Sequence, residues 1–346
     1  MRADSETGRE PGKRIVVTGA TGNAGTSIVS SLADDPRVGS VLGLARRRPV
    51  WAPTRTTWVA ADVEKDGDRV ITAHLEGADA VIHLAWAFQP THDPLATWRT
   101  NVLGSLRVFR AAVAAGVSAL VYASSVGAYS PGPKDHPVDE SWPTHGWPEA
   151  AYCREKAYLE RVLDTYELQH PGIRVVRMRP AFLFKEGAAS EQRRIFAGRL
   201  LPGALADPRL IPVVPDFDGL TFQALHTDDA ADAYRIAALR DDVRGAFNLA
   251  ADPPLGAEEL AALLDARVVR LPRAAARAVV AAGWGLRLLP SSPHLLDAFL
   301  RLPLLDCGRA HAELGWRPRR TGVEAVQSLL DGLRYGSGLP TPPLTP

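Results

Sequence analysis

A tyrosine and a lysine four residues apart, Tyr152 and Lys156, have the chemistry to move a proton. Residues 149–169 contain neither Gly nor Pro, so we expect a helix with both side chains on one face. A free phenol has a pKa near about 10, too high for acid–base work at neutral pH, and a neighbouring ammonium stabilises the phenolate. The pair therefore predicts a general acid or base tuned by a cation, although the same spacing also occurs in ordinary helix packing.

A glycine-rich loop predicts a seat for a dinucleotide pyrophosphate. Residues 14–18 have the β-branched pattern of a strand, and residues 27–32 have apolar residues at helical spacing. At such a turn Gly19 permits the tight bend, Gly22 lets the backbone approach the pyrophosphate, and Gly25 lets the helix pack against the strand. The G-x-x-G-x-x-G spacing departs from G-x-G-x-x-G, so the glycines alone are a weak signal. The loop residues expected to bind the dinucleotide are Gly19, Thr21, Gly22, Asn23, Ala24 and Gly25.

The residues after the second expected strand, residues 41–44, bear on the choice between NAD(H) and NADP(H). A carboxylate at this place accepts a hydrogen bond from the ribose 2′-hydroxyl of NAD. Here the strand is followed by Arg46, Arg47 and Arg48, whose guanidiniums could pair with a 2′-phosphate. We therefore expect NADP(H), bound by Arg46 and then Arg47, with NAD(H) as the alternative cofactor. A solvated basic turn is the other interpretation of these arginines.

Five ordered motifs resemble the extended short-chain dehydrogenase/reductase family, also called the NAD-dependent epimerase/dehydratase family. They are the glycine loop, the strand ending at residues 81–85, Asn101-Val102 at the start of a helix, Ser124-Ser125 before residues 126–129, and Tyr152-x-x-x-Lys156. The serines follow an apolar strand, which is where an open α/β sheet presents its ligands. The resemblance covers residues 13–335.

The resemblance implies a role for each matching residue. Tyr152 is expected to be the general acid/base, with Lys156 lowering its pKa and binding the nicotinamide ribose. Ser125 is expected to orient the substrate, in preference to Ser124. For Asn101 a buried polar cap between two elements is an equally good interpretation, and Asp62 could be a turn residue. Further cofactor contacts are expected from Asp62, Val63, Leu84, Ala85 and Asn101.

Three functional classes follow from this resemblance. The favoured class is an NAD(P)-dependent oxidoreductase that transfers a hydride between nicotinamide and a carbonyl or alcohol substrate. The alternative is a redox-neutral epimerase acting on a nucleotide sugar or related polyol, and the third is a non-catalytic dinucleotide sensor. Dehydration is less expected, because Val126-Gly127 stand where dehydratases of the family carry an Asp-Glu pair.

The substrate is expected to be a less polar small molecule than a nucleotide sugar. Nucleotide-sugar members commonly carry an arginine at the position of Phe222. The run Phe182-Leu183-Phe184 and the apolar helices near residues 271–305 are more typical of a pocket for a ketone or a similar compound.

Composition limits the other partners. The 346-residue chain is 46% hydrophobic with a formal net charge of +1, so nothing suggests nucleic-acid binding. Two cysteines, Cys153 and Cys307, form no metal-binding spacing, and we expect no metal. The opening residues are polar, and residues 274–289 are too short and too interrupted by arginine to span a bilayer. We therefore expect a cytoplasmic protein with no membrane partner.

Strand and helix patterns alternate, which predicts an α/β fold with a doubly wound, Rossmann-like parallel sheet. We expect a disordered lead-in at residues 1–12 and the dinucleotide-binding domain at 13–180, with sheet returns near 221–250. Residues 336–346 should form a flexible tail or a strap over the surface. Residues 181–335 should form a smaller, mostly helical substrate-binding region. A homodimer is expected through helices near residues 101–115 and 152–166.

Overall fold

The computed structural model describes residues 12–196, 198 and 211–345. Within these residues the central sheet has seven parallel strands in the order β11-β7-β5-β4-β1-β2-β3. Its strands run apolar and largely buried, as expected when helices cover both faces of a parallel sheet. They are β1 (Lys13–Thr18), β2 (Val38–Ala45), β3 (Thr56–Ala60), β4 (Ala80–His83), β5 (Ala119–Ala123), β7 (Arg174–Pro180) and β11 (Gly245–Leu249).

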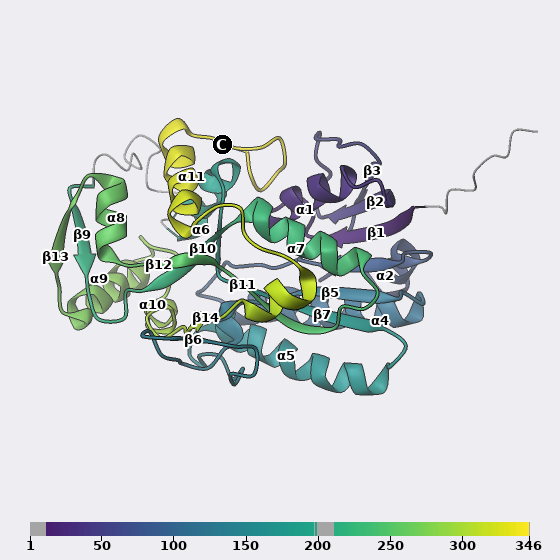
Figure 1. Cartoon of the computed structure of the whole chain (residues 1–346), viewed down its shortest axis with the longest axis horizontal. Helices are drawn as coiled ribbons and strands as arrows, with labels where there is room; N and C mark the ends of the chain where they lie inside the picture. The colour runs from purple at the N-terminus through teal and green to yellow at the C-terminus, as the bar shows by residue number, and fades with distance from the viewer. Residues whose placement is uncertain (1–11, 197, 199–210, 346) are drawn as a thin grey trace, which may run out of the picture.

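Helices pack on the two faces of this sheet (Figure 1). One apolar core joins α1 (Asn23–Ala33) and α7 (Thr227–Leu239) to the sheet. A second core on the other face joins α2 (Asp68–Leu75), α4 (Gly104–Ala114) and α5 (Ala151–Gln169). The expected doubly wound, Rossmann-like fold is confirmed. Because the strands are parallel, the ends of β1, β4 and β5 meet at one edge, and the site lies there.

A smaller region lies beyond the carboxyl ends of the strands. It contains two small sheets, in the orders β12-β10-β8 and β13-β9. Of the sheet returns expected near residues 221–250, β11 joins the central sheet, whereas the segment near residue 225 belongs to the smaller sheet and pairs with β8. Its elements are β8 (Phe182–Phe184), α6 (Ala189–Phe196), β9 (Val213–Asp216), β10 (Phe222–His226), β12 (Ala251–Leu255), α8 (Ala257–Leu264), β13 (Arg267–Arg270), α9 (Arg273–Gly285), α10 (Pro293–Phe299) and α11 (Gly322–Tyr335).

The remaining short elements connect these parts. They are α3 (Pro94–Trp98), the short helical turns η1 (Arg99–Leu103), η2 (Val126–Ala128), η3 (Glu186–Ala188) and η6 (Ala310–Leu314), and the strand pair β6 (Pro137–Val138) and β14 (Leu304–Leu305). The expected lead-in, residues 1–12, lies outside the described residues except for Gly12. No helix in the described part of the chain has the length and apolarity to cross a membrane.

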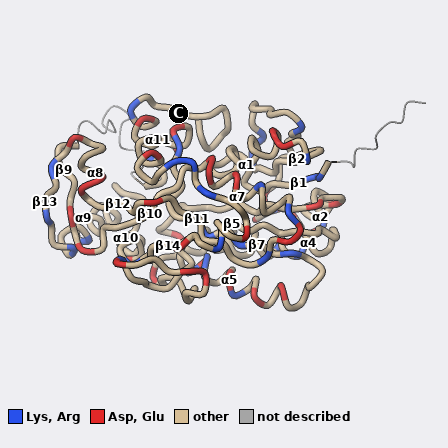
Figure 2. The backbone as a smooth tube through the Cα atoms, in the orientation of Figure 1, with Lys and Arg blue, Asp and Glu red and all other residues tan. Residues whose placement is uncertain are grey.

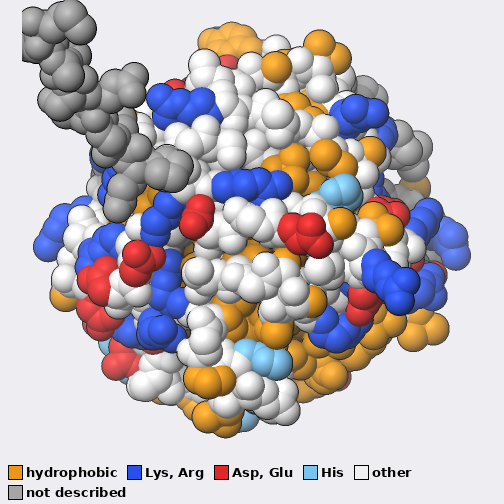
Figure 3. Space-filling view, turned by 90° about the vertical axis from the view of Figure 1, so that its right-hand side faces the viewer, with side chains coloured by type: hydrophobic (Ala, Val, Ile, Leu, Met, Phe, Trp, Pro, Cys, Tyr) orange, Lys and Arg blue, Asp and Glu red, His pale blue; other side chains and the backbone are white. Residues whose placement is uncertain are grey.

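Cationic and anionic side chains are mixed along the described chain (Figure 2). Figure 3 shows the same mixture on one face of the molecule. Neither view shows a stripe of one sign.

Candidate active site

The fold brings Ser125, Tyr152 and Lys156 together at the carboxyl edge of the sheet. Tyr152 and Lys156 lie in the first turns of α5, and Ser125 follows β5. The side chain of Ser125 interacts with the Tyr152 phenol and favours its ionised form. A Cβ at Gly127 would lie 2.7 Å from Tyr152 Cε1, so glycine at 127 permits this close approach. All three side chains line one cavity of about 720 Å³.

Burial controls the protonation of this group. Desolvation raises the pKa of Tyr152 to about 12, and the interaction with Ser125 opposes this only partly. Desolvation also lowers the pKa of Lys156 to about 7, although Glu155 and Glu160 oppose that shift. Lys156 Nζ donates to the carbonyl of Ala123 at 2.6 Å. Burial thus dominates the pKa of Tyr152 in this structure, and the expected lowering by Lys156 stays a prediction.

Aromatic rings that the sequence analysis did not identify as site residues surround Tyr152. The Trp86 ring meets Tyr152 edge to face at 5.7 Å between centroids, and the Phe88 ring lies at 5.0 Å. Trp86 also lies beneath the lysine, with Lys156 Nζ 3.5 Å from the centre of its ring. Such a cation–π contact stabilises the ammonium. Trp86 and Phe88 come within five residues of the end of β4. The same strand end predicted Leu84 and Ala85 as cofactor contacts, so it could also have indicated these two rings.

The glycine loop forms one end of the cavity and has the backbone that a pyrophosphate requires. Gly19 has a φ of +66°, in the left-handed region that favours glycine. A Cβ at Gly25 would lie 2.3 Å from the Gly19 oxygen, which requires glycine there. Gly22 caps α1 without a side-chain hydrogen bond, so its own side chain does not compete with an anion for the N–H groups of the first turn. The loop therefore fits the pyrophosphate of a dinucleotide.

The expected cofactor residues divide into three positions. Most of them line the cavity, and Arg47 lies in an adjoining hollow of about 400 Å³. Arg46 and Arg47 are both exposed at the end of β2, and no carboxylate follows this strand at residues 45–49. Lining residues among the expected ones are Gly19, Thr21, Gly22, Asn23, Ala24, Gly25, Arg46, Asp62, Val63, Leu84, Ala85, Ser125, Tyr152 and Lys156.

Asn101 takes the third position, behind the cavity wall. Its side-chain nitrogen donates to Ala87 O at 2.8 Å and to Glu155 at 2.7 Å, and its side-chain oxygen accepts from Ala87 N at 2.6 Å. The residue is 0% exposed and does not line the cavity. This geometry is that of a buried polar cap, which holds the residues after β4 against α5.

Two charged residues beside the glycine loop were also missed. Lys185 Nζ donates to Asn23 O at 2.8 Å and to the hydroxyls of Thr26 and Ser27 at 2.6 and 2.8 Å. Glu191 lines the cavity, and its carboxylate interacts with the backbone N–H of Asn23, which favours the ionised form. Burial outweighs this effect and raises the pKa of Glu191 to about 7. The carboxyl group therefore lies at the start of α1, beside the glycine loop.

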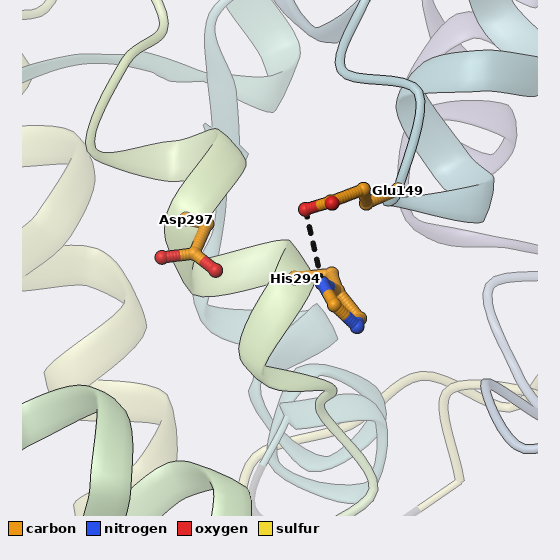
Figure 4. Close-up of side chains that lie close together, drawn as sticks. All are labelled: Glu149, His294 and Asp297. Atoms are coloured by element: carbon orange, nitrogen blue, oxygen red, sulfur yellow. Dashed lines mark ion pairs between the residues drawn. The ribbon is translucent and has the colours of Figure 1, made fainter.

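A group of potential metal ligands lies elsewhere. Among the described residues, ligand atoms of Glu149, His294 and Asp297 lie within 4.8 Å of one another. Figure 4 shows the ion pair between Glu149 and His294, whose atoms are 3.3 Å apart, with Asp297 beside it. Asp297 already pairs with Arg277 at 2.8 Å and with Arg273 at 3.5 Å. Arg301 lies 3.9 Å from the same carboxylate. Three guanidiniums thus supply positive charge at Asp297, and the group is an ion-pair cluster.

Comparison with known proteins gives a family and several relatives. The model of the NAD dependent epimerase/dehydratase family matches residues 15–250. An uncharacterised protein of Mycobacterium tuberculosis (strain ATCC 25618 / H37Rv) is 29% identical over 328 residues, which cover 94% of this chain and 31% of that protein. The chain thus spans about a third of the length of the first curated relatives it matches. The L-arabinose 1-dehydrogenase (NAD(P)(+)) of Haloferax volcanii is 32% identical over 112 residues, 32% of this chain and 41% of that protein.

Solved structures share the fold. The UDP-glucose-4-epimerase from Stenotrophomonas maltophila, with bound NAD and formylated UDP-arabinopyranose, superposes with a TM-score of 0.71. It is 21% identical, and the match covers 94% of this chain and 98% of that one. At this identity the similarity establishes the common architecture.

Proposed function

Because the chain belongs to the NAD dependent epimerase/dehydratase family, we propose that it is an NAD(P)-dependent oxidoreductase that interconverts a carbonyl and an alcohol. The observation that carries this proposal is that Ser125, Tyr152 and Lys156 line the same cavity as the glycine loop. An acid–base group and a dinucleotide seat in one cavity are the two parts that such a reaction needs.

In the proposed mechanism the bound nicotinamide dinucleotide supplies or accepts the hydride. Tyr152 donates its phenolic proton to the oxygen that becomes negative during reduction. The hydroxyl of Ser125 hydrogen-bonds the same oxygen and stabilises its charge. Lys156, held by Ala123 O and the Trp86 ring, places a cation beside the phenol when it is protonated. The rings of Trp86 and Phe88 exclude water from the reacting atoms.

The residues that would hold the dinucleotide are those at the glycine-loop end of the cavity. The N–H groups at the start of α1 would bind the pyrophosphate, and Arg46 would bind a 2′-phosphate. We therefore propose NADP(H) in preference to NAD(H). The absence of a carboxylate at residues 45–49 supports this preference.

The substrate proposed is an apolar ketone or the corresponding alcohol. Beyond Tyr152 the cavity is lined by rings that pack on one another, with Phe88 and Phe196 at 5.2 Å and Phe182 and Phe299 at 5.3 Å between centroids. Among the described lining residues the four Lys, Arg, Asp and Glu side chains are Arg46, Asp62, Lys156 and Glu191, none of them in this aromatic part. A nucleotide sugar would bury its diphosphate there without a cationic partner from these residues, which is unfavourable.

A second candidate is a redox-neutral epimerase. The similarity in fold to a UDP-glucose-4-epimerase over 94% of this chain supports it. An epimerase keeps its dinucleotide through turnover, whereas a reductase exchanges it.

The test begins with the freshly purified protein. It is denatured and any released dinucleotide is identified by mass spectrometry, and the emptied protein is then titrated with NADPH and NADH. An empty site that prefers NADPH, together with NADPH oxidation in the presence of aromatic or alicyclic ketones, would support the reductase. Retained NAD and turnover of UDP-glucose without net redox change would support the epimerase and refute the reductase. A protein that binds either dinucleotide but turns over no carbonyl or sugar would be a sensor.

A further inference from the structure

The segment from Ser337 to Thr345, which the sequence predicts as a flexible tail or a strap over the surface, folds back on the glycine loop. Thr341 is 1% exposed and Leu344 is 0% exposed. Figure 1 shows this stretch in yellow as a loop between α11 and the region of α1. We call residues 337–345 the strap.

The strap is compact in itself. Leu339 N donates to Leu344 O at 3.0 Å, and Leu344 N donates to Thr341 O at 2.9 Å. Prolines at positions 340, 342 and 343 limit the conformations of the free segment, which lowers the entropic cost of ordering it. The strap is therefore held in a defined conformation by its own hydrogen bonds and prolines.

The strap joins two walls of the dinucleotide site. On one side Thr341 Oγ1 donates to the carbonyl of Thr21 in the glycine loop at 2.9 Å, and this hydrogen bond is buried. On the other side the guanidinium of Arg194 in α6 donates to Pro343 O and, at 3.0 Å, to Thr345 O. The glycine loop and α6 are thus connected through strap atoms.

The strap also forms part of the wall between the cavity and the outer hollow that contains Arg47. Glu191, Ile195 and Pro343 line both the cavity and the outer hollow that contains Arg47. These shared residues form the wall between the two spaces. If the strap lifted, the glycine-loop end of the cavity would open into the hollow.

We propose that residues 337–345 retain the dinucleotide, with Thr341 as the residue that positions the glycine loop and fixes the strap over it. This inference rests on the proposed dinucleotide-dependent function. Release of the dinucleotide on this side requires the Thr341–Thr21 hydrogen bond to break and Pro343 to move away. The strap therefore sets the rate of release, and with it the exchange on which a reductase depends.

The experiment compares variants of the full chain by two readouts. Release of NADPH is followed by stopped-flow fluorescence after mixing the complex with excess NADP⁺. Amide hydrogen exchange at Gly19–Gly25 is measured without dinucleotide. Thr341→Val keeps the shape of the side chain and removes the hydroxyl, and a chain ending at Gly336 removes the strap. Thr72→Val is the matched control. The Thr72 hydroxyl donates to Asp68 O at 2.8 Å within α2, and this hydrogen bond is exposed.

Thr341→Val should release NADPH about two- to tenfold faster, the equivalent of one buried hydrogen bond. It should also speed exchange of the glycine-loop amides, whereas Thr72→Val should change neither. The shortened chain should release NADPH faster still. If Thr341→Val released NADPH at the wild-type rate and its glycine-loop amides exchanged at the wild-type rate, the proposal would be overturned. This outcome does not depend on whether the shortened chain folds. If the wild-type chain bound neither NADPH nor NADH, the proposed function would fail instead, and the exchange measurement would still report on the contact between strap and loop.

Discussion

Replacing Glu191 with Gln should remove a pH-dependent obstacle to dinucleotide binding. The Glu191 carboxylate interacts with the backbone N–H of Asn23, at the turn where the pyrophosphate is expected. Burial raises the pKa of this carboxyl to about 7, so it is neutral below that pH and an anion above it. The anion would repel the pyrophosphate and keep its N–H partner. Dinucleotide affinity should therefore be constant below pH 7 and fall as the pH rises through it.

The magnitude follows from linkage. If the neutral form binds and the anion does not, each pH unit above 7 costs about tenfold in affinity, or about 1.4 kcal/mol. At pH 8 binding should then take up nearly one proton. Two cations face the carboxylate, Lys185 from the segment after β8 and Arg194 from α6, and both favour its ionised form. Because the pKa of Lys185 is itself lowered by burial to about 8, the measurements belong between pH 6 and about 8.

The assay is isothermal titration with NADPH across this range, in two buffers of different ionisation enthalpy so that proton uptake is measured directly. Glu191→Gln should give a flat profile and bind about tenfold tighter than the wild type at pH 8. Glu258→Gln, at an exposed position of α8, is the control and should keep the wild-type slope. A wild-type affinity that does not change between pH 6 and 8, with no proton uptake, would refute the assigned competition.

Three further substitutions test the site. Tyr152→Phe should lower kcat about 10²- to 10⁴-fold while the Kd for NADPH stays unchanged, and unchanged turnover would remove Tyr152 from the mechanism. Arg46→Asp should weaken NADPH by about tenfold or more and leave NADH nearly unaffected, whereas equal changes for the two would contradict the 2′-phosphate contact. Gly25→Ala places a Cβ 2.3 Å from Gly19 O and should lower the free energy of unfolding by about 1–3 kcal/mol in denaturant melts; Gly67→Ala, where nothing lies within 4 Å, should have little effect.

The sequence predicted the features that depend on residues close together in the chain. Strand–helix alternation predicted the sheet, because buried parallel strands need continuous apolar runs. The expected helix places Tyr152 and Lys156 on one face, because the helix itself fixes their spacing. The choice of Ser125 over Ser124 came from the family resemblance. For the sheet and the helix the geometry depends on residues that are neighbours in the chain.

The sequence did not predict the contacts that join segments far apart in the chain. Glu191 and Lys185 reach the glycine loop only because α6 and the end of β8 pack over it, more than 150 residues along the chain. Thr341 meets Thr21 across 320 residues. The Pro- and Gly-rich composition of the strap is typical of flexible tails, and burial of Leu344 overrides it. Such contacts leave no periodic signal in a single sequence.

The protonation state of the site bears on the choice between the two enzyme classes. A reductase begins with a proton donor, whereas an epimerase begins by oxidising its substrate and needs a base. Burial holds Tyr152 as a neutral phenol through neutral pH, because its pKa lies at about 12. Lys156, with a pKa of about 7, is only partly charged there and stabilises a phenolate less than a full ammonium would. From this state the phenol can donate a proton to a carbonyl oxygen directly, whereas oxidation of an alcohol first requires the phenol to ionise.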